Sequence, residues 1–299
     1  GSGRGRGLSG RGLDPTTVSR RHRGGRPPQR RGRGQRGTTP VRSGGGRAKG
    51  LGGDQVEGRH AVRELLVAGT RSVREVVLAG DLDPAPILDD IIDLADEARV
   101  SIRELTRSRF ESMARTESPQ GVLALAAPLP DHDLDDLLVT DASGRRPFLL
   151  VLDGVTDPGN LGTMLRSAEC AGVTGVVLPR HRSARVTATV AKAAAGAIEH
   201  LRLAGVTGVP SALGRLSSAG VWSVGLDAGG SIPIHDLAVA DQPLALVLGS
   251  EGRGLSRLVR ERCDALAHIP IFGTLGSLNV GAAAAIALFE VARRRGPAG

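Results

Sequence analysis

Residues 148–170 read FLLVLDGVTDPGNLGTMLRSAEC, and this stretch decides the class of fold. Its first five residues, 148–152, form a continuous apolar run with the length of a buried strand. A loop with two Asp, two Gly and Pro158 follows, and it leads into a helical pattern that ends near Gly172. A buried strand, a polar loop and a helix in this order predict one unit of an α/β sheet.

Further apolar runs repeat this alternation towards the C-terminus. They lie at residues 173–178, 221–226, 244–248 and 267–271. Apolar strands separated by helical stretches are typical of a parallel sheet with helices on both faces. Ligands bind such sheets at the loops that leave the carboxyl ends of the strands. We therefore look for functional residues in those loops.

The first loop contains Asn160 at the expected start of the helix and Arg166 inside it. The Asn160 carboxamide is suited to cap free backbone N–H groups there. Arg166 stands among small residues, where a guanidinium is costly to bury unless it meets an anion or other acceptors. One interpretation is that Arg166 contacts an RNA phosphate or ribose. The other is a structural ion pair with Asp153 or Asp157.

The second loop, residues 249–254, reads GSEGRG. Its glycines allow a ligand to approach the backbone closely, or they form only a tight turn. The spacing matches neither the dinucleotide fingerprint nor a phosphate-binding Walker loop. Glu251 would repel a phosphate, so the loop suits a ligand that is cationic or rich in hydroxyls and amines.

The third loop follows the strand at 267–271 and contains Ser277, Leu278 and Asn279 before a helix rich in Gly and Ala. Small residues let another backbone pack closely against that helix. Ser277 is a plausible helix cap, and capping alone would account for both polar residues.

Other parts of the chain lie outside this sheet. Residues 54–128 show an α-β-α-β pattern that predicts a small α/β domain, and residues 129–147 read as a linker to a larger domain at 148–296. Residues 1–52 hold thirteen Arg, one Lys and a single acid, Asp14, a net charge of +13. This Gly- and Arg-rich tail is predicted to be disordered. It is either an arm that binds RNA phosphates without reading sequence or a solubilising extension.

Composition excludes several classes of protein. Without the tail the chain has 25 basic and 30 acidic residues, a net charge of −5, so charge alone is a weak argument for RNA binding by the domains. No apolar run reaches the ~18 residues of a membrane span. Two isolated cysteines and seven histidines without ligand spacing predict neither disulfides nor a metal site. We expect a cytoplasmic protein.

The order and spacing of residues 160–166, 248–252 and 269–280 resemble the three motifs of the SpoU (TrmH) family. Its members are RNA ribose 2′-O-methyltransferases of the SPOUT superfamily. The resemblance covers about residues 54–296, because Gly58-Arg59-His60-Ala61-Val62 is similar to the start of the family's small substrate-binding domain. It implies a parallel-sheet SPOUT domain with a C-terminal trefoil knot, bound S-adenosylmethionine and an active site formed across a homodimer.

The family's functional residues can be carried over to matching positions. Gly249, Ile269 and Leu278 match the cofactor contacts, which are largely made by backbone groups. Arg166 matches the catalytic arginine. The supporting polar residues of the family match four positions: Asn160, Glu251, Ser277 and Asn279.

The branch that this chain is most similar to methylates a guanosine in 23S ribosomal RNA. Residues 153–158, the segment 182–184 and the N-terminal domain carry that similarity. Gly281 replaces a second Ser common in the family, and residues 118–121 (SPQG) replace a common His-Gln-Gly. The alternatives are a transfer-RNA methyltransferase, an antibiotic-resistance enzyme that acts on ribosomal adenosine, and an assembly factor without catalysis.

A weak nucleophile such as a ribose 2′-hydroxyl needs help to attack a methyl group. Arg166 stays protonated as a rule, so we expect it to fix the ribose and to stabilise the developing alkoxide. Basic residues expected to bind RNA are Arg145, Arg146, Arg180, Arg182 and Arg185, although they also suit a solvated face.

Overall fold

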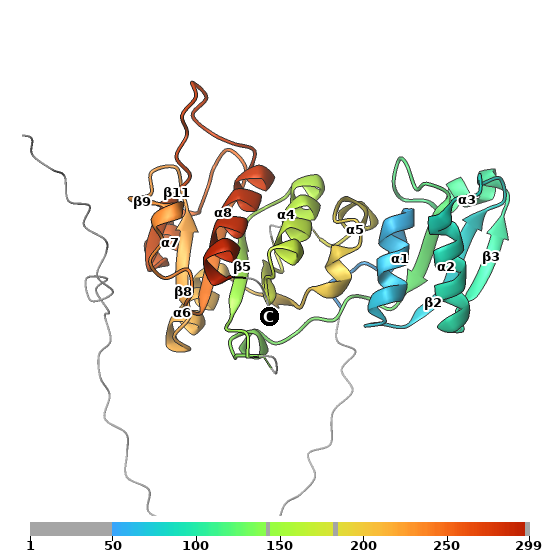
Figure 1. Cartoon of the computed structure of the whole chain (residues 1–299), viewed down its shortest axis with the longest axis horizontal. Helices are drawn as coiled ribbons and strands as arrows, with labels where there is room; N and C mark the ends of the chain where they lie inside the picture. The colour runs from blue at the N-terminus through green and yellow to red at the C-terminus, as the bar shows by residue number, and fades with distance from the viewer. Residues whose placement is uncertain (1–49, 142–143, 182–184, 297–299) are drawn as a thin grey trace, which may run out of the picture. The chain divides into compact units, whose positions relative to one another are not determined.

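The computed structural model describes residues 50–141, 144–181 and 185–296, and it contains two sheets (Figure 1). The Arg- and Gly-rich tail up to residue 49 lies outside the described residues. A helix with the length and apolar character of a membrane span does not occur in the described ranges.

The first sheet belongs to the small domain. Its strands have the order β1-β4-β2-β3, in which only the β2–β3 pair is parallel. The strands are β1 (Gln55–Glu57), β2 (Val73–Ala79), β3 (Ser101–Leu105) and β4 (Val122–Ala126). The helices are α1 (Arg59–Ala68), α2 (Pro86–Glu97) and α3 (Arg107–Met113). The predicted α-β-α-β order is confirmed, and β1 and α3 are additional.

Alternation along the strands divides the small-domain core between the two faces of this sheet. Val76 of β2 packs with α1 and α2, whereas its neighbour Val77 packs with Phe110 of α3. Successive strand residues point to opposite faces, so one short strand serves both layers.

The second sheet has the order β7-β6-β5-β10-β8-β11-β9, and its strand pairs are all parallel. The strands are β5 (Phe148–Asp153), β6 (Gly175–Pro179), β7 (Leu203–Val206), β8 (Trp222–Leu226), β9 (Ile232–Pro233), β10 (Leu244–Gly249) and β11 (Ala265–His268). All five predicted strands are therefore present, and β7 and β9 are additional. The last one ends at His268, before the predicted end at residue 271, because Pro270 has no N–H group to continue a ladder.

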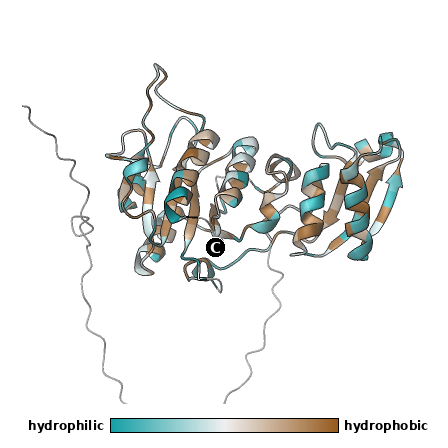
Figure 2. Cartoon of the chain, viewed as in Figure 1, coloured by the Kyte–Doolittle hydropathy of each residue, from teal (hydrophilic) through white to brown (hydrophobic). Residues whose placement is uncertain are grey.

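Helices cover both faces of the second sheet. They are α4 (Pro158–Cys170), α5 (Ala188–Ala193), α6 (Val209–Ser218), α7 (Arg257–Arg262) and α8 (Val280–Arg295). Leu150 of β5 packs on the side of α4 and α8, and Val151 packs on the side of α6 and α7. The hydropathy colouring shows the strands of this sheet as mostly brown, apolar elements (Figure 2).

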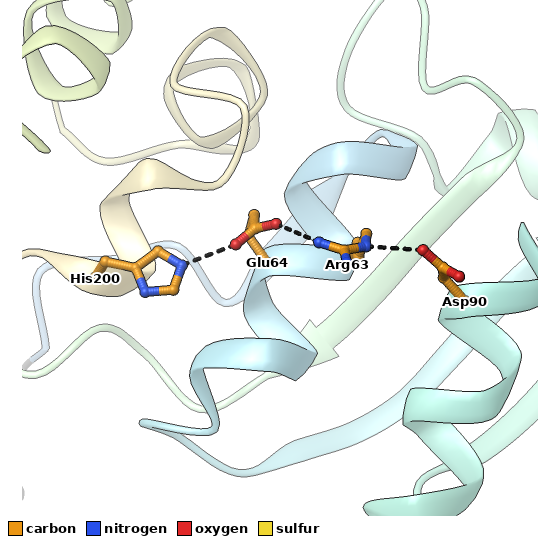
Figure 3. Close-up of polar contacts among 4 residues, drawn as sticks. All are labelled: Arg63, Glu64, Asp90 and His200. Atoms are coloured by element: carbon orange, nitrogen blue, oxygen red, sulfur yellow. Dashed lines mark hydrogen bonds and ion pairs between the residues drawn. The ribbon is translucent and has the colours of Figure 1, made fainter. Parts of the chain in front are cut away.

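Short 3₁₀ helices complete the fold: η1 (Asp135–Leu137), η2 (Ala197–His200) and η3 (Ile234–Asp236). At η2, Glu199 forms a buried ion pair with Arg71 at 2.6 Å. His200 lies 2.9 Å from Glu64 of α1, and Glu64 pairs with Arg63 (Figure 3). These contacts join the small domain to the larger one.

Candidate active site

Two of the three motif loops begin at paired positions of the sheet. The register places Asp153, the last residue of β5, opposite Gly249, the last residue of β10. Because β11 runs parallel to both, its final residue His268 leads into the third loop at the same edge of the sheet. The loops therefore leave the carboxyl edge together, as the parallel-sheet prediction required.

The start of α4 differs from the prediction for Asn160. The cap is Asp157, whose carboxylate accepts a hydrogen bond from the backbone N–H of Asn160 at 2.6 Å. Asp and Asn are equally good caps, so the sequence could not decide between them. Asn160 lies inside the helix, and its carboxamide is free for other contacts.

The Asn160 carboxamide joins the three motif loops. Its Nδ2 donates to Oε2 of Glu251 at 2.9 Å, and its Oδ1 accepts from Nδ2 of Asn279 at 2.9 Å. The partners lie 91 and 119 residues away along the chain. One amide, with one donor side and one acceptor side, thus fixes the loops after β5, β10 and β11 relative to one another.

Asn279 has a second role as the cap of α8. Its Oδ1 accepts from the backbone N–H groups of Gly281 at 2.9 Å and Ala282 at 3.3 Å. The expectation that Ser277 caps this helix is wrong, because the helix begins three residues later, at Val280. Ser277 is exposed in the loop, where its hydroxyl is available to a ligand.

The glycine loop after β10 folds tightly onto itself. Ser250 and Gly254 form a bridge with hydrogen bonds of 3.1 and 2.9 Å. A Cβ atom on Gly249 would lie 2.0 Å from the carbonyl carbon of Gly254. Gly249 is therefore required by the loop itself, and the turn presents Glu251 at its exposed tip.

Backbone groups suited to a ligand occur in the third loop. The main chains of Ile269 and Leu278 form no hydrogen bond within the part of the chain that the structure describes. Ile269 is half-buried, so its free N–H and C=O groups need a partner. Leu278 is 43% exposed and offers apolar surface nearby in the same loop. Free backbone groups and apolar surface in one loop are suited to a heterocyclic ligand. The cofactor contacts expected for Ile269 and Leu278 stay a prediction.

Arg166 stands apart from this cluster. It is exposed on α4, so the expected cost of burying it does not arise. The alternative of an ion pair with Asp153 or Asp157 is wrong: Asp153 accepts from the backbone N–H of Ser256 at 2.7 Å, and Asp157 caps the helix. Within the described residues, the Arg166 guanidinium has no hydrogen-bonding or ion-pair partner.

Thiolate and metal chemistry have no support among the described residues. Burial raises the pKa of the Cys263 thiol to about 12, so it stays protonated at neutral pH. Burial also raises the pKa of Cys170, which is exposed on α4. The described ranges contain no group of His, Cys, Asp and Glu that could hold a metal ion.

The arginines expected to bind RNA do not form one patch. Arg145 and Arg146 precede β5 and so lie at the amino edge of the sheet, whereas Arg180 follows β6 at the carboxyl edge. Arg145 pairs with Asp141 at 2.7 Å, and Arg180 pairs with Asp131 at 2.6 Å. Arg185 is exposed. Arg182 lies outside the described residues.

One residue without a signal in the sequence is Arg295, the last of three consecutive arginines at residues 293–295. Its guanidinium lies 4.7 Å from the ring centroid of Phe148 and donates to the carbonyl oxygen of Ala240 at 2.9 Å. Burial lowers the pKa of this guanidinium to about 10. Arg295 thus fastens the end of α8 to the start of β5, a structural rather than a chemical role.

Comparisons with known proteins identify the family of this chain. Residues 147–289 match the model of the SpoU rRNA Methylase family, and residues 55–132 match the model for RNA 2′-O ribose methyltransferase substrate binding. The 23S rRNA (guanosine-2′-O-)-methyltransferase RlmB of Vibrio cholerae is 41% identical over 80% of this chain and 96% of its own length. The chain belongs to the SpoU methylase family.

Other SpoU relatives extend the comparison. A TrmH family tRNA/rRNA methyltransferase of Bacillus subtilis, YacO, is 38% identical over 82% of this chain and 98% of its own. The SpoU methyltransferase AviRb from Streptomyces viridochromogenes, solved in complex with the cofactor AdoMet, superposes with a TM-score of 0.67. It shares 27% identity and covers 81% of this chain and 89% of its own. The resemblance seen in the sequence is confirmed.

Proposed function

We propose that this SpoU protein transfers the methyl group of S-adenosylmethionine to the ribose 2′-hydroxyl of a guanosine in 23S ribosomal RNA. The observation that carries the proposal is the hydrogen-bonded chain from Glu251 through Asn160 to Asn279, which unites the three motif loops. The identity to RlmB and the match of the small domain to a substrate-binding model support the choice of substrate.

The cofactor is held by backbone groups of Gly249, Ile269 and Leu278. When bound, S-adenosylmethionine supplies a methyl group on a sulfonium, which is electrophilic and needs no metal. The main chains of Ile269 and Leu278, which have no partner among the described residues, provide donors and acceptors for a heterocycle. Glu251, oriented by Asn160, places negative charge at the same edge of the sheet, which suits a cationic ligand better than a phosphate.

Arg166 acts on the ribose. As a permanently charged donor it fixes the sugar and stabilises the alkoxide that develops as the 2′-proton leaves. Ser277 and Asn279 orient the sugar or the cofactor from the third loop. Asn279 is held by its cap to α8, so its amide is already in position before substrate binds.

A homodimer with the family's trefoil knot completes the site. Arg166 lies six residues beyond Asn160, about 9 Å along α4 and on another face of the helix. Next to α4, helix α8 exposes Ile286 (44%) and Phe289 (49%). Arg166 has no partner among the described residues, and the apolar stripe on the neighbouring helix suits a partner subunit whose substrate Arg166 contacts.

The small domain, the linker and the tail bind the RNA substrate in the cytoplasm. The domains at 54–128 and 148–296 are joined by residues 129–147, and the tail at 1–52 adds charge for phosphates. Arg145, Arg146, Arg180, Arg182 and Arg185 contribute further contacts.

Single-turnover methylation of transcribed 23S rRNA by Arg166→Ala tests the proposed role of Arg166. We expect a loss of about a hundredfold in rate, the size found when a donor to a developing oxyanion is removed. Affinity for S-adenosylmethionine, measured by calorimetry, should be unchanged. Arg257→Ala, at a side chain that is 91% exposed on α7, is the matched control. A rate like that of the wild type in Arg166→Ala would refute the role.

A further inference from the structure

A groove of about 540 Å³ lies in the small domain, where β2 ends and where α1 and α3 begin. The methyl-transfer site does not use it. The residues that line the groove include Arg59, Asp81, Leu82, Arg107, Glu117 and Gln120. Its volume is that of a small-molecule site and accommodates one nucleoside.

One rim of the groove has an unusual backbone. Gln120 adopts a left-handed conformation with φ +57°, and Gly121 follows with φ +74°. The Gln120 side-chain oxygen accepts from the backbone N–H of Arg59 at 3.1 Å, at the start of α1. Its carbonyl oxygen accepts from Nε of Arg59 at 3.3 Å. Gln120 thus keeps Arg59 at the groove, while its own Nε2 stays free within the described residues.

The buried carboxylate of Glu57 holds the segment that leads into this rim of the groove. Glu57 is fully buried, and it accepts hydrogen bonds from the backbone N–H groups of Arg115 at 2.6 Å and Thr116 at 3.0 Å. It also accepts from the Thr116 hydroxyl at 2.6 Å and from Nε2 of Gln55 at 2.7 Å. A buried charge with this many donors fixes the loop in one conformation. The groove is therefore formed before any ligand arrives.

The charges of the groove exclude a phosphate as its main ligand. Its lining includes two guanidiniums and four carboxylates: Arg59, Arg107, Asp81, Asp83, Glu111 and Glu117. Arg107 is paired with Asp81 at 2.5 Å. Glu117 is exposed and forms no hydrogen bond or ion pair within the described residues. The half-buried Leu82 and Pro119 offer apolar surface to a flat ring.

We propose that this groove binds an unstacked guanosine of the RNA substrate, with the Glu117 carboxylate accepting the N1–H and N2–H groups of the base. Guanine presents two adjacent donors on its Watson–Crick edge, and the free amide of Gln120 can donate to its O6. Single-stranded bases are the part of RNA that proteins read by such edge contacts. The inference rests on the proposed function only for the choice of RNA as ligand.

The test compares two labelled RNA decamers, uridine throughout except for one central guanosine or one central inosine, which lacks the N2 amine. Fluorescence anisotropy with the full chain, without S-adenosylmethionine, gives the ratio of the two dissociation constants. Phosphate contacts cancel in this ratio. We expect the wild type to favour guanosine by about tenfold, the effect of one good base contact.

Glu117→Gln should bring the ratio close to one. The control Glu97→Gln changes an exposed carboxylate at the C-terminal end of α2, whereas Asp83 of the groove precedes the N-terminal end of this helix. This variant should keep the wild-type ratio. A wild-type ratio of one, or a preference that survives in Glu117→Gln, would overturn the inference. Both results are independent of catalysis, so methylation of 23S rRNA could persist while this inference fails, or the reverse.

Discussion

At the scale of single residues, Gly249 shows that the loop after β10, which we propose binds the cofactor, has no room for a side chain at this position. A methyl group there would collide with the carbonyl of Gly254, and the bridge between Ser250 and Gly254 would have to open. Gly249→Ala is therefore expected to weaken binding of S-adenosylmethionine at least about tenfold, because the loop that binds it is displaced. Isothermal titration calorimetry measures this affinity.

The matched control is Gly214→Ala in α6, where an added Cβ would meet nothing within 4 Å. Cofactor affinity should be unchanged there, and stability should rise by up to about 1 kcal/mol from helix propensity. Equal affinities of Gly249→Ala and the wild type would show that the tight loop is not part of the cofactor site.

The polar residues of the motifs could be chosen from the sequence, but their separate roles could not. Asn160, Ser277 and Asn279 are all good helix caps, and so is Asp157. Which residue caps a helix depends on the position at which the helix begins. For each of these two helices, the candidate caps lie only two or three residues apart. The bridging role of Asn160 depends on partners 91 and 119 residues away, which local reasoning cannot see.

At the scale of elements, the ion pair between Arg71 and Glu199 ties η2 to the small domain. Both side chains are at most 2% exposed, and Arg71 also donates to the carbonyl oxygens of Gly53 and Ala127 at 2.5 Å. Glu199→Gln leaves a buried guanidinium without its counter-charge. We expect the free energy of unfolding to fall by about 3 kcal/mol, measured by denaturant titration.

The ion pairs of Arg63 at the surface provide the comparison for the Glu199 variant. Arg63 pairs with Glu64 and Asp90 at the surface (Figure 3), where water screens the charges. Arg63→Gln should cost less than about 1 kcal/mol. An equal loss of stability in both variants would show that the buried ion pair of Arg71 and Glu199 does not hold η2 to the small domain.

Strands were easier to predict than the contacts between elements. Four of the five predicted strands of the large sheet are apolar runs that are largely buried on both faces, as a parallel sheet requires, whereas in β11 only Ala267 is buried. The missed β7 has only four residues, of which Ala204 and Gly205 carry little apolar signal, and β9 has two. The burial of Arg71 could not be predicted from the sequence, because its partner Glu199 is 128 residues away.

At the scale of the whole molecule, the exposed stripe on α8 bears on the proposed dimer. Phe289→Glu places a charge in that stripe, and burying it against a partner would be costly. We expect the dimer to dissociate into monomers and methylation to be lost, because Arg166 would have no partner site. Light scattering after size-exclusion chromatography measures the mass.

Val139→Glu serves as the control, since Val139 is an apolar side chain that is 63% exposed outside α8. This variant should keep the mass and the activity of the wild type. A monomeric wild type that is fully active would rule out a shared active site.

The convergence of the three loops could be predicted from sequence, because parallel strands bring their carboxyl ends to one edge. The separation of Arg166 from that cluster could not, since it depends on which face of α4 remains exposed. The groove at Glu117 could not be predicted either, although the motif positions 58–62 and 118–121 contribute to its walls, because these segments are adjacent only in the folded domain.

Methyl transfer to a guanosine 2′-hydroxyl in 23S rRNA can be checked with a map of the 2′-O-methyl groups in ribosomal RNA. RNA from cells that lack the gene is compared with RNA from the same cells complemented by the wild type or by Arg166→Ala. We expect one guanosine 2′-O-methyl mark that disappears in the deletion strain and returns only with the wild type. An unchanged map, or a mark restored equally by Arg166→Ala, would contradict it.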